Sequence, residues 1–94
     1  MSKIFRAISI RQPFAELILM GKKKFENRST LTNIRERVYL YASMQQGGSE
    51  AQLKQTGKTF EKLPKGIIVG SVEIIDCRET EDGYAYKLAN PKRI

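Results

Sequence analysis

The sequence predicts an α+β fold: a small mixed β-barrel with one well-defined helix near the N-terminus and a second, weak helix in the middle of the chain. Two observations support this prediction. Several segments read as strands, because they alternate apolar with polar residues or are rich in β-branched residues. One short segment instead spaces its apolar residues three and four positions apart, as a helix does. The expected strands cover residues 3–10, 24–28, 38–42, 67–77 and 84–88.

The first helix is expected directly after Pro13, because proline fits the first helical turn, where its missing N–H costs nothing. Phe14, Leu17 and Ile18 then form one apolar face. Gly21 is placed to end the helix in the left-handed conformation. The helix should therefore be short and should pack through that apolar face.

A charged strand follows the helix. Its side chains alternate, so that Lys24, Glu26 and Arg28 point one way while Phe25 and Asn27 point the other. A strand with this pattern is half buried. Its charged face needs either solvent or a ligand.

The remaining elements are expected from local signals. Val38, Leu40 and Ala42 should face the core from one strand, and Ser49 should cap the weak second helix. Gly70, inside the longest hydrophobic strand, suggests a bulge or a close backbone approach. An Asp-Gly pair at residues 82–83 predicts a hairpin turn, and the returning strand should end at Asn90-Pro91.

Composition limits the classes of function. The 94 residues allow one domain (1–94), and Lys plus Arg exceed Asp plus Glu by 17 to 10, which gives a net charge of +7. This excess favours nucleic acid or another polyanion as a partner, although a protein can also be basic without binding one. One cysteine and no histidine exclude an internal disulfide and leave zinc without its usual ligands, so no metal and no cofactor are expected. No membrane span or signal peptide is recognisable, and a cytoplasmic location is expected.

Two further groups of residues are candidates for binding. Arg11 and Gln12 stand just before the first helix, where free backbone N–H groups can meet an anion or a base edge, but Gln12 can instead cap the helix. Arg35 and Arg37 can clamp a phosphate, or belong to a solvated turn. Tyr41 can stack on a base, although packing against a neighbouring element is the more common use of a tyrosine.

The sequence resembles the ASCH (activating signal cointegrator homology) family, a branch of the PUA-like β-barrels, over almost its whole length. The matching blocks are Ser9-Ile10, Gln12-Pro13-Phe14-Ala15, Gly21, Lys23, Glu26, Arg28-Ser29, the strand that begins with Arg35 and Arg37, and residues 70–77. The resemblance implies a cleft between the helix and the barrel, lined by Lys23, Glu26 and Arg28. It also implies that this cleft receives a nucleotide or a nucleic-acid strand.

Three functions follow as hypotheses. The first is an RNA-binding module, which the basic composition supports. The second is a small hydrolase, because some ASCH-like proteins resemble ribonucleases or amidohydrolases acting on N4-acetylcytidine. In that case Lys23 would stabilise an oxyanion as a fixed positive charge and Glu26 would move a proton. The third is a protein-binding adaptor, and whether the chain is an enzyme stays open.

The resemblance carries one more expectation. ASCH-like chains usually continue past the Asn-Pro pair into a strand that closes the barrel, whereas this sequence ends at Ile94. A barrel without that strand leaves unpaired backbone groups at an edge, which can recruit another chain. We therefore expect either a piece of a longer protein or a homodimer through the open sheet edge.

Overall fold

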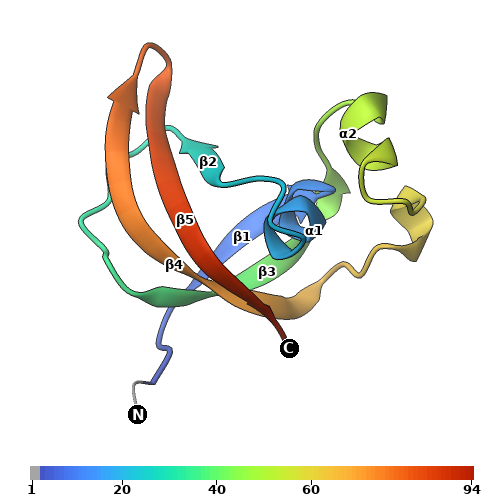
Figure 1. Cartoon of the computed structure of the whole chain (residues 1–94), viewed down its shortest axis with the longest axis horizontal. Helices are drawn as coiled ribbons and strands as arrows, with labels where there is room; N and C mark the ends of the chain where they lie inside the picture. Colours follow the sequence, from blue (N-terminus) through green and yellow to red (C-terminus); the bar gives the residue numbers. More distant parts are fainter. Residues whose placement is uncertain (1–2) are drawn as a thin grey trace.

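The computed structural model describes residues 3–94, which form one curled sheet with short helices beside it (Figure 1). The elements in chain order are β1 (Ala7–Gln12), α1 (Phe14–Leu19), β2 (Phe25–Arg28), β3 (Arg37–Gln46), α2 (Glu50–Lys54), the 3₁₀-helix η1 (Phe60–Lys62), β4 (Ile67–Thr80) and β5 (Gly83–Arg93). The strands lie in the order β1-β3-β4-β5-β2, with β1 parallel to β3 and all other pairs antiparallel. The sheet curls into a half-barrel, which confirms the predicted α+β fold class.

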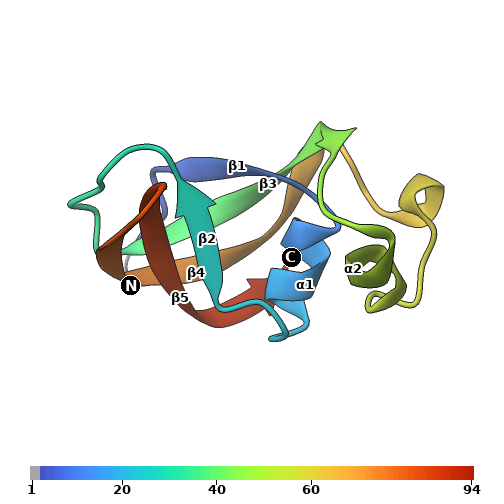
Figure 2. The same ribbon diagram turned by 90° about the horizontal axis from the view of Figure 1, so that it is seen from above.

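Helix α1 lies at one end of the curled sheet, and α2 lies outside it (Figure 2). The chain turns away after α1 at Gly21, whose φ of +78° is the left-handed conformation expected there. Ser49 and Gln52 form a capping box at the start of α2, which buries none of its residues. Among residues 3–94, no helix is long and apolar enough to cross a membrane.

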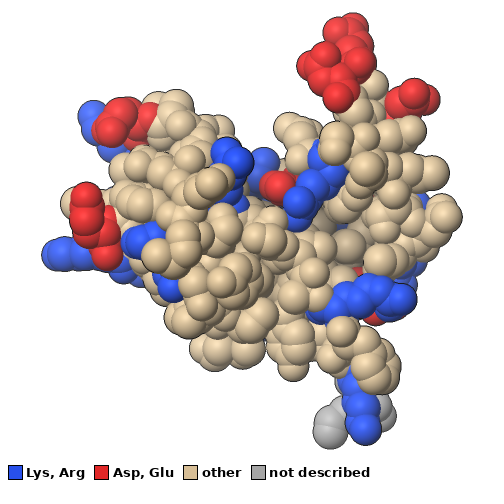
Figure 3. Space-filling view, turned by 180° about the vertical axis from the view of Figure 1, so that it is seen from behind, with Lys and Arg blue, Asp and Glu red and all other residues tan. Residues whose placement is uncertain are grey.

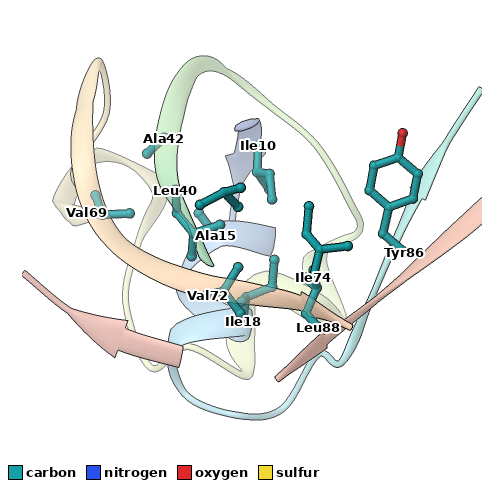
Figure 4. Packing of buried hydrophobic residues seen from close by; sticks show 11 residues of the cluster. Ile10, Ala15, Ile18, Leu40, Ala42, Val69, Val72, Ile74, Tyr86 and Leu88 are labelled. Atoms are coloured by element: carbon teal, nitrogen blue, oxygen red, sulfur yellow. The ribbon is translucent and has the colours of Figure 1, made fainter. Parts of the chain in front are cut away.

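The core sits between α1 and the inner face of the sheet (Figure 4). Val38, Leu40 and Ala42 of β3 are fully buried, as the alternation in the sequence predicted. Ala15 and Ile18 bring the buried side of α1 against them. Phe14, which was expected on the same apolar face, is only partly buried. Phe14 nevertheless packs against the core cluster.

The prediction that the last strand ends at Asn90-Pro91 is wrong. Strand β5 continues to Arg93, because one extra residue is accommodated as a bulge where Asn90 takes a positive φ of 52°. The bulge lets the chain pass Pro91, which has no N–H for the sheet, and pair again with β4. The pairing brings the Lys92 carbonyl so close to Gly70 that no larger residue fits there. The close approach expected at Gly70 is thus confirmed.

Candidate nucleic-acid interface

The charged side of β2 faces into the half-barrel rather than into solvent. Glu26 lies opposite Tyr86 on β5, and Tyr86 is part of the core. Because paired residues of neighbouring strands project to the same face, Glu26 shares the inner face with Tyr86. Its side chain keeps only 12% of its surface exposed, whereas the apolar Phe25 is 40% exposed on the outer face. The strand therefore turns its charges inward.

Arg28 spans the open seam between the two edge strands. Its Nη2 donates a hydrogen bond of 2.8 Å to the carbonyl oxygen of Ser9 on β1. Its Nε lies 3.6 Å from Oε2 of Glu26, too far for a hydrogen bond, and is buried without a hydrogen-bond partner. One arginine therefore connects β2 to β1 and also holds a positive charge beside a buried carboxylate.

Glu26 is a largely buried carboxylate with incomplete hydrogen bonding. Within residues 3–94 its carboxylate accepts no hydrogen bond, and its ion pair is the 3.6 Å contact with Arg28. Burial raises the pKa of Glu26 above its ordinary value of 4.5, although the charges of Arg28 and Lys23 pull in the opposite direction. Such a group gains free energy from any ligand that donates hydrogen bonds to it.

Lys23 lies over the ring of Phe14, which is partly buried and packs against the core cluster as expected. Its Nζ lies 5.0 Å from the centroid of the Phe14 ring, within the range of a cation–π contact. The ring packs against Gly47, where an added Cβ would lie 2.8 Å from the Phe14 Cε2 atom. Gly47 and Gly48 have no side chains and therefore make room for the Phe14 ring.

Arg11 and Gln12 follow each other on β1 but have different surroundings. Arg11 is exposed, makes no side-chain hydrogen bond or ion pair within the described residues, and lies beside Gly47 two residues after Ser9. Gln12 is fully buried: its Oε1 accepts from the Glu16 N–H at 2.9 Å, and its Nε2 donates to the Pro64 carbonyl at 3.0 Å. Arg11 is therefore exposed on β1 near Gly47, whereas Gln12 holds the start of α1.

The other expected binding residues lie apart from this group. Arg35 donates to two carbonyl oxygens of its own loop, and Arg37 donates to Ser71, Glu73 and the Asn90 carbonyl. Tyr41 lies on the face of β3 opposite the core and is half buried. Within residues 3–94, no side-chain contact joins these three residues to Glu26 or Arg28. The structure thus brings together Lys23, Glu26 and Arg28, whereas Arg11 is exposed on β1 two residues after Ser9.

The surface view agrees with this arrangement. Figure 3 shows a hollow between the acidic tip of the β4–β5 hairpin and the α2 end of the molecule, with basic side chains around an acidic one at its base. Beside the seam, a cavity of about 300 Å³ reaches from Ser9 and Arg28 to the core residues Val38, Ile74 and Tyr86. In the described part of the chain, no group of three or more His, Cys, Asp or Glu residues could hold a metal ion.

The chain is thus a small half-barrel with a largely buried carboxylate beside cationic side chains at its open seam. Comparison with known families shows to which class of domain this half-barrel belongs. The chain belongs to the ASCH domain family, whose model matches residues 8–90. This match confirms the resemblance found in the sequence.

Two curated relatives share the domain. The chain is similar to Activating signal cointegrator 1 from Homo sapiens, with 32% identity over 80 residues, covering 74% of this chain and 14% of that protein. The protein of the same name from Mus musculus matches to the same extent. The chain thus spans 14% of the length of these relatives, and the comparison concerns the domain only.

Proposed function

We propose that this domain binds single-stranded RNA at the seam between β1 and β2. The observation that carries the proposal is the inward-facing pair of Glu26 and Arg28, with Lys23 close enough to affect the carboxylate. The net charge of +7 supports a polyanionic ligand. The ASCH family membership supports the same class of ligand.

The proposal assigns a separate task to each type of group. Arg11 and Lys23 contact phosphates, because both are cationic and neither has an acidic partner among the described residues. Glu26 accepts hydrogen bonds from the N–H groups of a base, which its carboxylate lacks in the free protein. Since the edges of bases are accessible only where they are unpaired, the ligand is a single strand rather than a duplex.

Salt dependence and substitution test this proposal together. Binding of a fluorescent single-stranded RNA should weaken steeply with salt, with a log–log slope of about −0.7 for each phosphate contacted. Lys23→Ala and Arg11→Ala should each reduce the affinity by roughly fivefold and make the slope shallower. Lys62→Ala is the matched control, because Lys62 is exposed on η1 and makes no side-chain hydrogen bond or ion pair among residues 3–94.

Arg28→Ala should weaken RNA binding more than Lys62→Ala. Because Arg28 also connects strands β1 and β2, the unfolding free energy of the Arg28→Ala variant must be measured together with its affinity. A flat salt response, or equal effects of Lys23→Ala and Lys62→Ala, would contradict RNA binding at the seam.

A second candidate function, hydrolysis of N4-acetylcytidine or a related modified nucleoside, rests on the raised pKa of Glu26. A carboxyl group whose pKa is raised toward neutral pH by burial is better suited to transfer a proton. Lys23 would stabilise the negative charge that forms on the carbonyl oxygen when water attacks it. If this function is correct, Lys23→Ala and Glu26→Gln each abolish release of acetate while the fold stays intact. Absence of turnover in the unmodified protein rejects it and leaves the RNA proposal untouched.

A further inference from the structure

A second concavity lies between the turn that follows α1 and the middle of β4 and β5, and it shares Lys23 with the proposed RNA site. Its volume is about 290 Å³, and its floor is formed by Ile18, Val72 and Leu88. These three side chains lie together where β4 passes α1 (Figure 4). Ile75 and Pro91 form part of the wall, and Ile75 is 45% exposed. The pocket is thus an apolar depression that opens to solvent.

The rim of this pocket is cationic. Lys23, Lys24 and Lys87 line it, and none of the lining residues is acidic in the part of the chain that the structure describes. Lys24 and Lys87 make no side-chain hydrogen bond or ion pair within residues 3–94. Asp76 is paired with Lys87 in the sheet register, but its carboxylate is held by Arg78 at 3.0 Å and by the N–H of Cys77. The positive charges of Lys24 and Lys87 are therefore not neutralised by the protein itself, whereas Lys23 also lies close enough to Glu26 to lower its pKa.

We propose that this pocket docks an acidic peptide segment of a partner protein, with one large apolar side chain of the segment inserted between Ile75 and Leu88. The volume is close to the lower end of the range for ligand pockets, about 300–1,000 Å³, which suits one side chain. Burial of that side chain supplies affinity, and the lysines select acidic flanking residues. The proposal goes beyond RNA binding, because it concerns another class of partner and a pocket that shares one residue, Lys23, with the proposed RNA site.

The lining also distinguishes a peptide from a nucleic acid. No aromatic ring lines the pocket among the described residues, so a base would find no ring to stack on. The apolar floor offers no side-chain hydrogen-bond donor or acceptor, and the polar edge of a base would lose its hydrogen bonds with water there. An aliphatic or phenyl side chain incurs no such cost. The lysines alone would attract a nucleic acid, but the apolar floor disfavours its bases.

A short synthetic peptide with one Phe flanked on both sides by Asp and Glu is the direct probe. Its affinity is measured by fluorescence anisotropy, and its position by changes in the backbone amide NMR signals. Two control peptides separate the contributions: one has Ser in place of Phe, and the other has Lys in place of every acid. The protein variants are Ile75→Ser, Lys87→Ala and Lys24→Ala, with Lys62→Ala as the matched control outside the pocket.

We expect the acidic Phe peptide to bind with shifts at residues 87–91, and the Ser and Lys peptides to bind at least about tenfold more weakly. Ile75→Ser and Lys87→Ala should each reduce the affinity by roughly fivefold, while their affinity for single-stranded RNA stays unchanged. Equal binding of the Phe and Ser peptides, or full affinity in both protein variants, would overturn the proposal. Shifts at residues 87–91 caused by RNA rather than by the peptide would also overturn it, and would assign this surface to nucleic acid.

Discussion

Two clusters of charged side chains contain the same kinds of residue, but the pKa of the glutamate is shifted in opposite directions in them. Each cluster consists of one glutamate with little exposed side-chain surface, one arginine and one lysine. In the first cluster, Glu16 of α1 receives two hydrogen bonds from Arg93, at 2.9 and 2.8 Å, and Lys58 lies 3.9 Å away. The pKa of Glu16 is lowered below 4.5, chiefly by the hydrogen bonds from Arg93.

In the second cluster the same kinds of residue leave the carboxylate incompletely satisfied. Arg28 approaches Glu26 only to 3.6 Å, because its Nη2 donates to the Ser9 carbonyl instead. Lys23 is held over the Phe14 ring. Burial then dominates, and the pKa of Glu26 is raised.

The two clusters differ in the hydrogen bonds that the carboxylate receives and not in the charges around it. Hydrogen bonding therefore distinguishes the structural ion pair of Glu16 from the candidate site at Glu26. Arg93 places both nitrogens on one carboxylate and ties the end of β5 to α1. Arg28 divides its contacts between a backbone oxygen and a carboxylate. Only the second arrangement leaves hydrogen-bonding capacity on Glu26 for a ligand.

The largest expected effect is on stability, from Arg93→Ala. It leaves Glu16, whose side chain is 4% exposed, without its two hydrogen bonds. Because the Arg93 side chain itself is 52% exposed, the loss should be about 2–3 kcal/mol, the cost of leaving a buried charged acceptor unsatisfied. Urea-induced unfolding at neutral pH measures the loss. Arg78→Ala is the control, because the Arg78–Asp76 pair is on the surface, where solvent screens it, and its loss should be much smaller. Equal losses of unfolding free energy in the two variants would mean that the Arg93–Glu16 pair contributes no more to stability than a surface ion pair.

The two glutamates should also respond to pH in opposite directions. Glu16, with its lowered pKa, contributes stability that is present above pH 4.5 and is lost as the pH falls through its folded-state pKa. Glu16→Gln should therefore lose about 2 kcal/mol at neutral pH, and less in acid.

Glu26, with its raised pKa, contributes stability that is present below pH 4.5 and is lost as the pH rises through its folded-state pKa. Glu26→Gln, which mimics the protonated acid, should gain up to about 1 kcal/mol at neutral pH and nothing in strong acid. Unfolding curves at a series of pH values give both profiles, and a loss of stability in Glu26→Gln at neutral pH would contradict the comparison.

The smallest effect is expected from Lys58→Ala. Lys58 lies 3.9 Å from Glu16, and its side chain is 47% exposed, so the pair should contribute only about 0.3 kcal/mol. A thermal unfolding comparison with Arg93→Ala would show whether the hydrogen bonds or the charges matter. A loss as large as that of Arg93→Ala would assign the stability to charge.

Local patterns predicted most of the fold. The alternation of Val38, Leu40 and Ala42 reports burial directly, and Gly21 marks a helix end through its own backbone preference. The continuation of β5 past Pro91 was missed, because the bulge at Asn90 depends on pairing with a strand far away in the sequence.

The site was predicted in part. The alternation in the sequence indicates that Glu26 and Arg28 share a face, and the ASCH resemblance implies that these two residues and Lys23 line the binding cleft. The inward direction of that face and the bond from Arg28 to Ser9 depend on how the sheet curls. The pairing of Arg93 with Glu16 also depends on the tertiary structure, because Glu16 lies on α1, far from Arg93 in the sequence. The sequence shows only that Arg93 is basic.

Titration of the two side-chain carboxyl groups by ¹³C NMR tests the central claim most directly. Signals of Glu16 and Glu26 are followed from acid to neutral pH in the intact domain. The structure predicts that Glu26 titrates above its ordinary value of 4.5 and Glu16 below it. Titration of Glu26 at or below 4.5 would show that its carboxylate is already satisfied in the free protein, and would contradict its assignment to a binding site.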